Sequence, residues 1–277
     1  MKVTRFEGEV VMSEHILVER RDGVLSLTLA RPERRNAITV AMYAALADAI
    51  EGAASDPTVR LITLEGQGED FTGGNDLADF LKDMPAPGSD ADVPVWRLLR
   101  ALANNEVPLV AAVHGNAVGI GTTLLFHCDL VIAEQGSRFV MPFVDLGLVP
   151  EAASSLIMPR LSGRRAAARH ILLGEPFGAD QALALGIASH VVATGELDAA
   201  LAKLVAALLA KPAEAMRLTQ ALLRQADRAE VLERMELENG HFSERLTSDE
   251  VRDAIAAFFA ARAARQSLFQ FPGSGTG

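Results

Sequence analysis

Short apolar runs alternate with amphipathic stretches over the first half of the chain. Residues 16–18 and 24–29 are two such runs on either side of Asp22-Gly23, an arrangement that predicts a β-hairpin. Thr39 is a suitable N-cap for a helix that reaches about residue 54, because apolar side chains recur there at helical spacing. The same criteria predict strands at 61–64, 108–113 and 130–133, a turn at 114–119, and helices at 95–104 and 121–126. This alternation over short connections predicts right-handed crossovers and a largely parallel sheet.

Alanine and leucine dominate the second half of the chain. From about residue 154 helical periodicity continues to about residue 265, interrupted by one β-like run at 188–192. We therefore expect an α/β core followed by a helical region. The expected boundaries are a loose extension at 1–14, the core at 15–195, the helical region at 196–267 and a tail at 268–277. The most loop-like internal stretch is 84–92, and the sequence leaves open whether it is a lid.

The composition is that of a globular protein with an acidic surface. Hydrophobic residues make up 49% of the 277 residues and charged residues 22%, which is enough apolar material for a complete core. The 36 acidic residues outnumber the 26 basic ones, and the net charge of −10 disfavours nucleic acid as a partner. A single cysteine excludes an intramolecular disulfide and any cysteine-rich metal site. No apolar run approaches the ~20 residues that span a bilayer and residues 1–14 lack a signal-peptide core, so we expect a soluble, cytoplasmic protein without membrane contact.

Several familiar catalytic motifs are absent from the sequence or incomplete in it. The chain has no phosphate-binding P-loop, no His-Glu-x-x-His zinc motif and no Gly-x-Ser-x-Gly nucleophile motif. Gly119-Ile120-Gly121 opens a predicted helix as a dinucleotide fingerprint would, but Leu124 stands at the third glycine position. His127-Cys128-Asp129 has the residue types of nucleophilic catalysis. Adjacent side chains point in different directions, however, so we interpret this tripeptide as the end of a helix entering a strand.

Two glycine-rich loops are more informative. Residues 71–77 and 114–121 each follow a predicted strand and precede helix-like sequence. Each loop can present a backbone N–H with little obstruction, and the second lies at a helix N-terminus with its partial positive charge. Two such donors that converge on one oxygen form an oxyanion hole. Glycine is also common in strand-to-helix turns for purely conformational reasons, so both interpretations stay open at this point.

The order of several motifs resembles that of the crotonase (enoyl-CoA hydratase/isomerase) superfamily, from about His15 to about Arg265. The resemblance is carried by residues 29–38 (Leu-Ala-Arg-Pro-Glu-Arg-Arg-Asn-Ala-Ile), 71–77 (Phe-Thr-Gly-Gly-Asn-Asp-Leu), 108–119 (Pro-Leu-Val-Ala-Ala-Val-His-Gly-Asn-Ala-Val-Gly) and 139–151, which begins Phe-Val-Met-Pro and ends Pro-Glu. It implies an α/β fold, a crotonase-like spiral of ββα units, with a C-terminal helical trimerisation region. It also implies a homotrimer or a hexamer built as a dimer of trimers.

The resemblance further implies a substrate class and a set of contacts. The substrates would be acyl-CoA thioesters, with coenzyme A as part of the substrate and no separate cofactor or metal. The N–H groups of Gly73 and Ile120 would form the oxyanion hole. Contacts to CoA or the acyl group would come from Arg34, Gly74, Asn75, Asp76, Gly119 and Phe143. Arg34 or Arg35 would meet the CoA phosphates, although such a cluster is also typical of a solvated turn. Arg262 would reach the CoA of a neighbouring subunit, a role weakened by Ala261, where many relatives carry lysine.

Two departures from the family pattern restrict the reactions that the site can catalyse. A hydratase of this superfamily holds its water with two glutamates, and the matching positions here are Thr123 and Phe143. Threonine is no general base at neutral pH, and phenylalanine does not polarise water. Asp145 lies two residues beyond the second position, so its side chain points in a different direction. We therefore do not expect Asp145 to replace the missing glutamate.

Glu151 is the carboxylate that remains. The segment Pro-Glu-Ala-Ala-Ser-Ser at 150–155 resembles the Pro-Glu-Gly-x-Ser-Ser segment of peroxisomal-type Δ3-Δ2-enoyl-CoA isomerases, whose single catalytic glutamate stands at this position. The alternative is a carboxylate that merely favours the start of a helix at Ser154. The resemblance therefore implies an enzyme of fatty-acid or related acyl-CoA metabolism in which Glu151 shifts the double bond of a 3-enoyl-CoA to the 2-position.

Other functions remain as alternatives. The first is an enoyl-CoA hydratase, and the second is a non-catalytic acyl-CoA-binding homologue. A third would use Glu151 as a nucleophile, as aromatic acyl-CoA dehalogenases use an aspartate there, but 5% aromatic residues and the single Trp96 provide poorly for an aryl pocket. An RNA-binding branch of the superfamily also exists, and the charge of −10 disfavours it.

Overall fold

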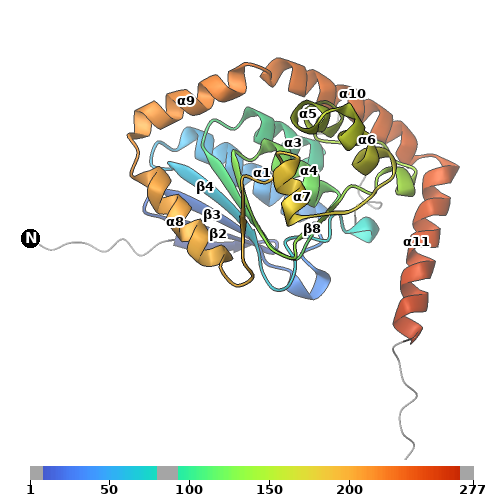
Figure 1. Cartoon of the computed structure of the whole chain (residues 1–277). Helices are drawn as coiled ribbons and strands as arrows, with labels where there is room; N and C mark the ends of the chain where they lie inside the picture. The colour runs from blue at the N-terminus through green and yellow to red at the C-terminus, as the bar shows by residue number, and fades with distance from the viewer. Residues whose placement is uncertain (1–8, 80–92, 269–277) are drawn as a thin grey trace, which may run out of the picture.

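A seven-stranded sheet lies at the centre of the molecule, which a computed structural model describes over residues 9–79 and 93–268 (Figure 1). Its strand order is β1-β2-β3-β4-β5-β7-β10, antiparallel from β1 to β3 and parallel from β3 onward. The strands are β1 (Glu9–Ser13), β2 (Ile16–Arg21), β3 (Val24–Leu29), β4 (Leu61–Gly66), β5 (Leu109–Val113), β7 (Leu130–Glu134) and β10 (His190–Val192). Asp22 and Gly23 both have positive φ, the conformation that a two-residue hairpin turn requires between β2 and β3.

A second, three-stranded sheet has the order β6-β8-β9. Its strands are β6 (Asn116–Val118), β8 (Arg138–Val140) and β9 (Phe177–Gly178). The helices of the core are α1 (Val40–Ser55), α3 (Pro94–Asn104), α4 (Ile120–Thr123), α5 (Ser154–Ser162), α6 (Arg164–Leu172) and α7 (Ala179–Ala184), with 3-10 turns η1 (Pro32–Arg34), η2 (Leu124–His127) and η3 (Val144–Leu146). The remaining helices are α8 (Leu197–Leu209), α9 (Ala213–Gln225), α10 (Arg228–Leu246) and α11 (Asp249–Leu268).

Strand alternation gives the large sheet two buried faces. In β4, Leu61 joins a small cluster with Leu197 and Leu201 of α8, whereas Ile62 and Leu64 belong to the main core. Successive side chains of a strand point to opposite faces, so a sheet that is covered on both sides reads as a nearly continuous apolar run. This is why the parallel strands have apolar residues at both odd and even positions.

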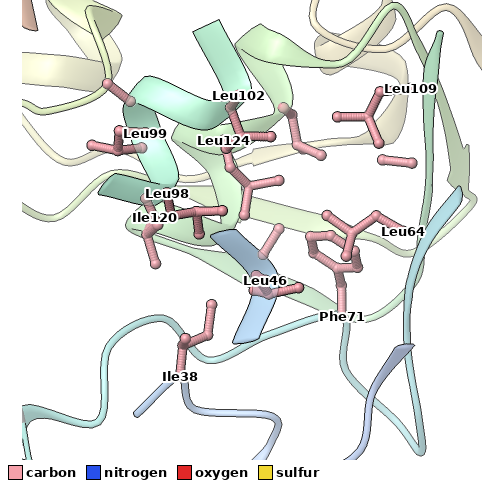
Figure 2. Packing of buried hydrophobic residues seen from close by; sticks show 14 of the residues in the cluster. Ile38, Leu46, Leu64, Phe71, Leu98, Leu99, Leu102, Leu109, Ile120 and Leu124 are labelled. Atoms are coloured by element: carbon pink, nitrogen blue, oxygen red, sulfur yellow. The ribbon is translucent and has the colours of Figure 1, made fainter. Parts of the chain in front are cut away.

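The main core lies between the sheet, α1 and α3, and it extends to the loop that begins α4. Figure 2 shows part of this core, in which Leu46 of α1 and Leu98 and Leu102 of α3 pack with Leu64, Phe71 and Ile120. All of these side chains are buried. The packing therefore anchors the two glycine-rich loops, because Phe71 is the first residue of the first loop and Ile120 lies near the end of the second.

The C-terminal helices cover one side of the core and then leave it. In Figure 1, α9 and α10 run across the top of the molecule, and α11 projects away from the body. Arg224 of α9 ties this region to the core, since its guanidinium donates to the carbonyls of Leu102 at 2.8 Å and His127 at 2.6 Å. No helix in the described parts of the chain is both long enough and apolar enough to cross a membrane.

Most predicted elements are confirmed. The hairpin, the helix that follows Thr39 and the predicted parallel strands are present, and the Thr39 hydroxyl accepts a hydrogen bond from the Met42 N–H at 3.2 Å. The prediction of a loose extension at 1–14 is wrong for 9–13, which pair with β2 as β1. The prediction of a simple turn at 114–119 is also wrong, because 116–118 form β6. The loop predicted at 84–92 and most of the tail at 268–277 lie outside the described residues.

Candidate active site

The two glycine-rich loops lie against each other. Thr72 and Ala117 form a parallel bridge, in which the Thr72 N–H donates to the Asn116 carbonyl at 2.9 Å and the Val118 N–H donates to the Thr72 carbonyl at 3.1 Å. Glycine is required on both sides of this contact. A Cβ on Gly74 would lie 2.7 Å from the Val118 carbonyl oxygen, and one on Gly121 would overlap the Thr72 side chain. The two loops therefore lie side by side, as an oxyanion hole with one donor from each loop requires.

The assignment of the Gly73 N–H to the oxyanion hole is wrong. This N–H donates to the Arg35 carbonyl at 2.7 Å, so it is already used within the fold. The Gly74 N–H is used as well, because it donates to the Thr72 hydroxyl at 3.1 Å. A backbone donor that holds a structural hydrogen bond is not available for a substrate oxygen.

Asn75 carries the available N–H of this loop. Ile38 forms a parallel bridge with Asn75, in which the Ile38 N–H donates to the Gly74 carbonyl at 2.8 Å and the Asp76 N–H to the Ile38 carbonyl at 2.9 Å. In such a bridge the polar groups of the central residue point away from the partner strand. The Asn75 N–H makes no hydrogen bond to any other described residue.

Ile120 carries the second available N–H. It is the first residue of α4, where the helix supplies no partner for the N–H group. Within the part of the chain that the structure describes, this N–H makes no hydrogen bond. The Ile120 side chain is fully buried with Leu98 and Leu99 of α3 (Figure 2), which holds the backbone in place. Gly119, with φ 56° and ψ −116°, leaves open space where a Cβ would project.

Glu151 is a fully buried carboxylate just before α5. Neither of its oxygens makes a hydrogen bond to a described residue. Burial, and secondarily the negative charge of Glu238, raise the pKa of Glu151 to about 8, while the nearby Thr123 hydroxyl opposes the rise. A carboxylate without solvation or hydrogen bonds binds a proton tightly, so Glu151 has the properties of a general base.

Neither of the hydratase positions supplies a second carboxylate. Thr123 is buried, and its hydroxyl lies 3.5 Å from the Ile120 carbonyl. Phe143 is buried in the main core. Asp145 is exposed, and its carboxylate faces Gly174. Among the described residues, the carboxylate whose charge acts on Glu151 is that of Glu238, which accepts hydrogen bonds from backbone N–H groups.

Tyr43 belongs to this site, although sequence analysis did not identify it. It lies on the buried face of α1, and its hydroxyl donates to the Asn75 side-chain carbonyl. Burial and the negative charge of Glu151 raise the pKa of the Tyr43 phenol well above its usual value. The hydrogen bond to Asn75 connects the phenol to the first glycine-rich loop, whereas the helical spacing of Met42, Leu46 and Ile50 indicated only a core position.

The predicted CoA contacts have varied surroundings. Arg34 is exposed in η1 and makes no ion pair with a described residue. Arg35 lies 3.7 Å from the Asp70 carboxylate. Asp76 is bound by the Arg31 guanidinium at 2.8 Å, which lowers the pKa of Asp76 and gives this residue a structural partner. The Arg262 side chain lies outside the described part of the chain.

The tripeptide His127-Cys128-Asp129 is structural. Burial lowers the pKa of His127 to about 4, and its Nε2 lies 2.9 Å from the Ala152 carbonyl. Burial raises the pKa of the Cys128 thiol, which makes it a poor nucleophile. Asp129 accepts from the Leu109 N–H and from Gln220 of α9. No group of three His, Cys, Asp or Glu side chains in the described ranges is arranged to hold a metal ion.

The raised pKa of Glu151 predicts opposite pH trends for activity and stability. A reaction that uses the ionised carboxylate should become faster as the pH rises through about 8. The folded state binds the Glu151 proton more tightly than the unfolded state does, so between the ordinary value of 4.5 and about 8 the protein loses stability as the pH rises. The free energy of unfolding, measured against pH for the wild type and Glu151→Gln, should diverge over this range, with the wild type falling. Parallel curves would contradict a buried, titrating Glu151.

Comparisons of the sequence and of the structure with known proteins match this chain to the same family. The profile of the family "Enoyl-CoA hydratase/isomerase" matches residues 19–266. The chain is 34% identical over 255 residues to 1,2-epoxyphenylacetyl-CoA isomerase of Escherichia coli K12, covering 91% of this chain and 97% of that protein. It is 31% identical over 255 residues to enoyl-CoA delta isomerase 2 of Rattus norvegicus, covering 91% of this chain and 65% of that protein. The crystal structure of an enoyl-CoA hydratase/isomerase from Pseudoalteromonas atlantica T6c superimposes with a TM-score of 0.85 at 37% identity, covering 90% and 98% of the two chains. Related proteins also include hydratases and a dehalogenase.

Proposed function

Because the chain belongs to the enoyl-CoA hydratase/isomerase family, we propose that it moves the double bond of a 3-enoyl-CoA to the 2-position, with Glu151 as the single base. The family supplies the substrate class, an acyl-CoA thioester. The buried, unpaired carboxylate of Glu151 is the observation that favours isomerisation. In this proposal the coenzyme A of the substrate is the one non-protein group required.

The proposed reaction uses one base and two backbone donors. The thioester oxygen accepts hydrogen bonds from the N–H groups of Asn75 and Ile120. Glu151 removes a proton from C2, and the electrons of the C–H bond pass into a dienolate whose negative charge rests on the thioester oxygen. The protonated Glu151 then returns the proton to C4, leaving the double bond between C2 and C3. A donor of this kind contributes about 3–4 kcal/mol to stabilisation of the transition state.

The surroundings of Glu151 support a proton shift over the addition of water. Hydration requires groups that hold and activate a water molecule beside the acyl chain. The two family positions for such groups carry Thr123 and Phe143, and Phe143 is buried among apolar side chains. A one-base transfer requires a carboxylate with high proton affinity in dry surroundings, which matches Glu151.

Hydration of a 2-enoyl-CoA is the second candidate function. It is favoured by the Thr123 hydroxyl close to Glu151, which would offer one hydrogen bond to a water molecule. A purely acyl-CoA-binding protein is disfavoured, because an unpaired buried carboxylate costs stability and binding alone does not use it.

Two parallel incubations distinguish these functions. The protein is mixed with a 3-enoyl-CoA and with a 2-enoyl-CoA of equal chain length, and the products are followed by absorbance and separated by chromatography. We expect 2-enoyl-CoA from the first substrate and little 3-hydroxyacyl-CoA from the second at equal enzyme concentration. Rapid hydration of the 2-enoyl-CoA, with no product from the 3-enoyl-CoA, would assign the protein as a hydratase.

We also propose that the C-terminal helices mediate assembly into a trimer or a dimer of trimers. Leucine side chains on α9 and α10 are exposed to 49% (Leu218), 68% (Leu222), 69% (Leu223) and 54% (Leu237). An apolar surface of this kind is typical of a subunit interface. Sedimentation equilibrium at micromolar concentration should give three or six times the mass of the 29.5 kDa chain. A stable monomer would contradict the proposal.

A further inference from the structure

The segment that carries Glu151 has an unfavourable backbone. Ala152 and Ala153 follow Glu151 with φ of 60° and 54°, in the left-handed region that is unfavourable for a residue with a Cβ. Both alanines are buried. A conformation of this kind persists only where the surrounding structure holds it, so the contacts of this segment determine where the Glu151 carboxylate lies.

Glu238 of α10 makes the central contact with this segment. One carboxylate oxygen of Glu238 accepts the Ala153 N–H at 2.6 Å, and the other accepts the Ser155 N–H at 3.0 Å. These N–H groups belong to the start of α5, where the helix itself provides no partner. Glu238 is buried, with an exposed fraction of 5%. A buried carboxylate therefore completes the N-terminus of the helix that follows Glu151.

Other groups hold the rest of the segment. The Ser154 hydroxyl donates to the Glu151 carbonyl at 2.6 Å, and His127 Nε2 lies 2.9 Å from the Ala152 carbonyl. Both of these contacts are to carbonyls. Glu238 differs because it holds N–H groups, and because it brings a negative charge close enough to influence Glu151.

We infer that Glu238 is a positioning residue, through which α10 fixes the place of the Glu151 carboxylate and holds a negative charge beside it. The inference rests on the proposed function, in which Glu151 is the base. Two N–H donors on the two oxygens match an ionised Glu238, because a protonated carboxyl would present its own O–H on one of them. The role links the C-terminal helical region to the chemistry of the core.

The groups that interact with Glu151, Glu238 and the segment between Glu151 and α5 come from α10, α1, α4 and η2. Burial raises the pKa of Glu238, and the hydrogen bonds from Ser155 and Ala153 together with the charge of Arg234 oppose that rise. The Arg234 guanidinium also donates to the Ser155 hydroxyl at 3.4 Å. The Tyr43 phenol of α1 and the Thr123 hydroxyl interact electrostatically with Glu151, and His127 Nε2 of η2 lies 2.9 Å from the Ala152 carbonyl. Burial lowers the pKa of His127 to about 4, so His127 is neutral at the pH of the assay. The change of charge at Glu238 is thus the one that should move the titration of Glu151.

The test is Glu238→Gln, with Glu236→Gln as the matched control. Glu236 lies on the same helix and is exposed, so it undergoes the same change of charge away from the segment. Glutamine keeps the size of Glu238 but presents its NH₂ group to one of the two N–H donors, and misplacement of a catalytic group by ~1 Å can cost ~100-fold in rate. We expect kcat for 3-enoyl-CoA to fall about 10- to 100-fold with KM nearly unchanged, and the midpoint of the pH–kcat profile to move to lower pH.

A second variant and a second measurement keep the test decisive. Glu238→Asp retains the charge, so its pH midpoint should stay near that of the wild type even if kcat falls; it also serves if Glu238→Gln does not fold. Infrared titration of the protonated-carboxyl band that Glu151→Gln removes reports on Glu151 without turnover. If the wild type fails to isomerise but this band titrates lower in Glu238→Gln, the proposed function is wrong and the role of Glu238 stands. An unchanged midpoint in Glu238→Gln, or a loss equal to that of Glu236→Gln, would overturn the inference.

Discussion

Replacement of Glu151 by glutamine should reduce isomerisation of 3-enoyl-CoA by about 10³-fold or more while leaving acyl-CoA binding nearly intact. Glutamine has almost the same shape, so the buried site should remain filled, but its amide does not accept the C2 proton. The loss should therefore fall on kcat, with KM changing little. The variant should also be more stable than the wild type above pH 8, because it no longer buries an unpaired carboxylate.

Asp145→Asn is the matched control for this experiment. Asp145 follows Phe143, close to a family position for a catalytic carboxylate, but its side chain is exposed. The control should retain the wild-type rate. If Glu151→Gln isomerised normally and Asp145→Asn did not, the base would be Asp145 and Glu151 would be a residue of the helix start.

Replacement of Ile120 by proline should reduce kcat by about 10²- to 10³-fold, because it removes one donor of the proposed oxyanion hole. Proline is tolerated at the first position of a helix, where the N–H has no partner in the helix. Ile120 occupies this position in α4. The substitution therefore removes the N–H while α4 keeps its own hydrogen bonds.

Ile120→Val separates the backbone effect from the packing effect. The Ile120 side chain is fully buried, so both variants lose core packing. Valine keeps the N–H, and its kcat should remain within a few-fold of the wild type. Equal losses in the two variants, measured at matched folded fraction, would show that packing rather than the N–H controls the rate. A Gly73→Pro variant would not test the oxyanion hole, because the Gly73 N–H holds the Arg35 carbonyl.

Local patterns in the sequence were sufficient to predict most of the large sheet. Asp22-Gly23 identifies the hairpin. Thr39 marks the start of α1 because its hydroxyl accepts the N–H of Met42, only three residues further along the chain. The second sheet was not predicted, since β6 and β8 have three residues and β9 has two. Segments this short carry no periodicity, and they exist because a partner strand lies beside them.

The candidate site was predictable only in part, because contacts between residues far apart in the sequence decide the rest. The glycine loops and Glu151 are visible in the sequence, but the identity of the free N–H is decided by the pairing of Gly73 with Arg35 and of Asn75 with Ile38. Those partners lie more than thirty residues away along the chain. Glu238 is separated from Ala153 by 85 residues, and it lies in a helix whose sequence shows nothing unusual at this position. Long-range contacts of this kind require the folded structure.

The fate of a deuterium label at C2 tests the central claim most directly. A 3-enoyl-CoA deuterated at C2 is converted in ordinary water, and the product is analysed by NMR for deuterium at C4. If one buried carboxylate carries the proton between the two carbons, a measurable share of the label should reach C4 with the wild type, because Glu151 is shielded from solvent. Complete loss of the label to water, with no deuterium at C4 even at the earliest times, would contradict a one-base transfer by Glu151.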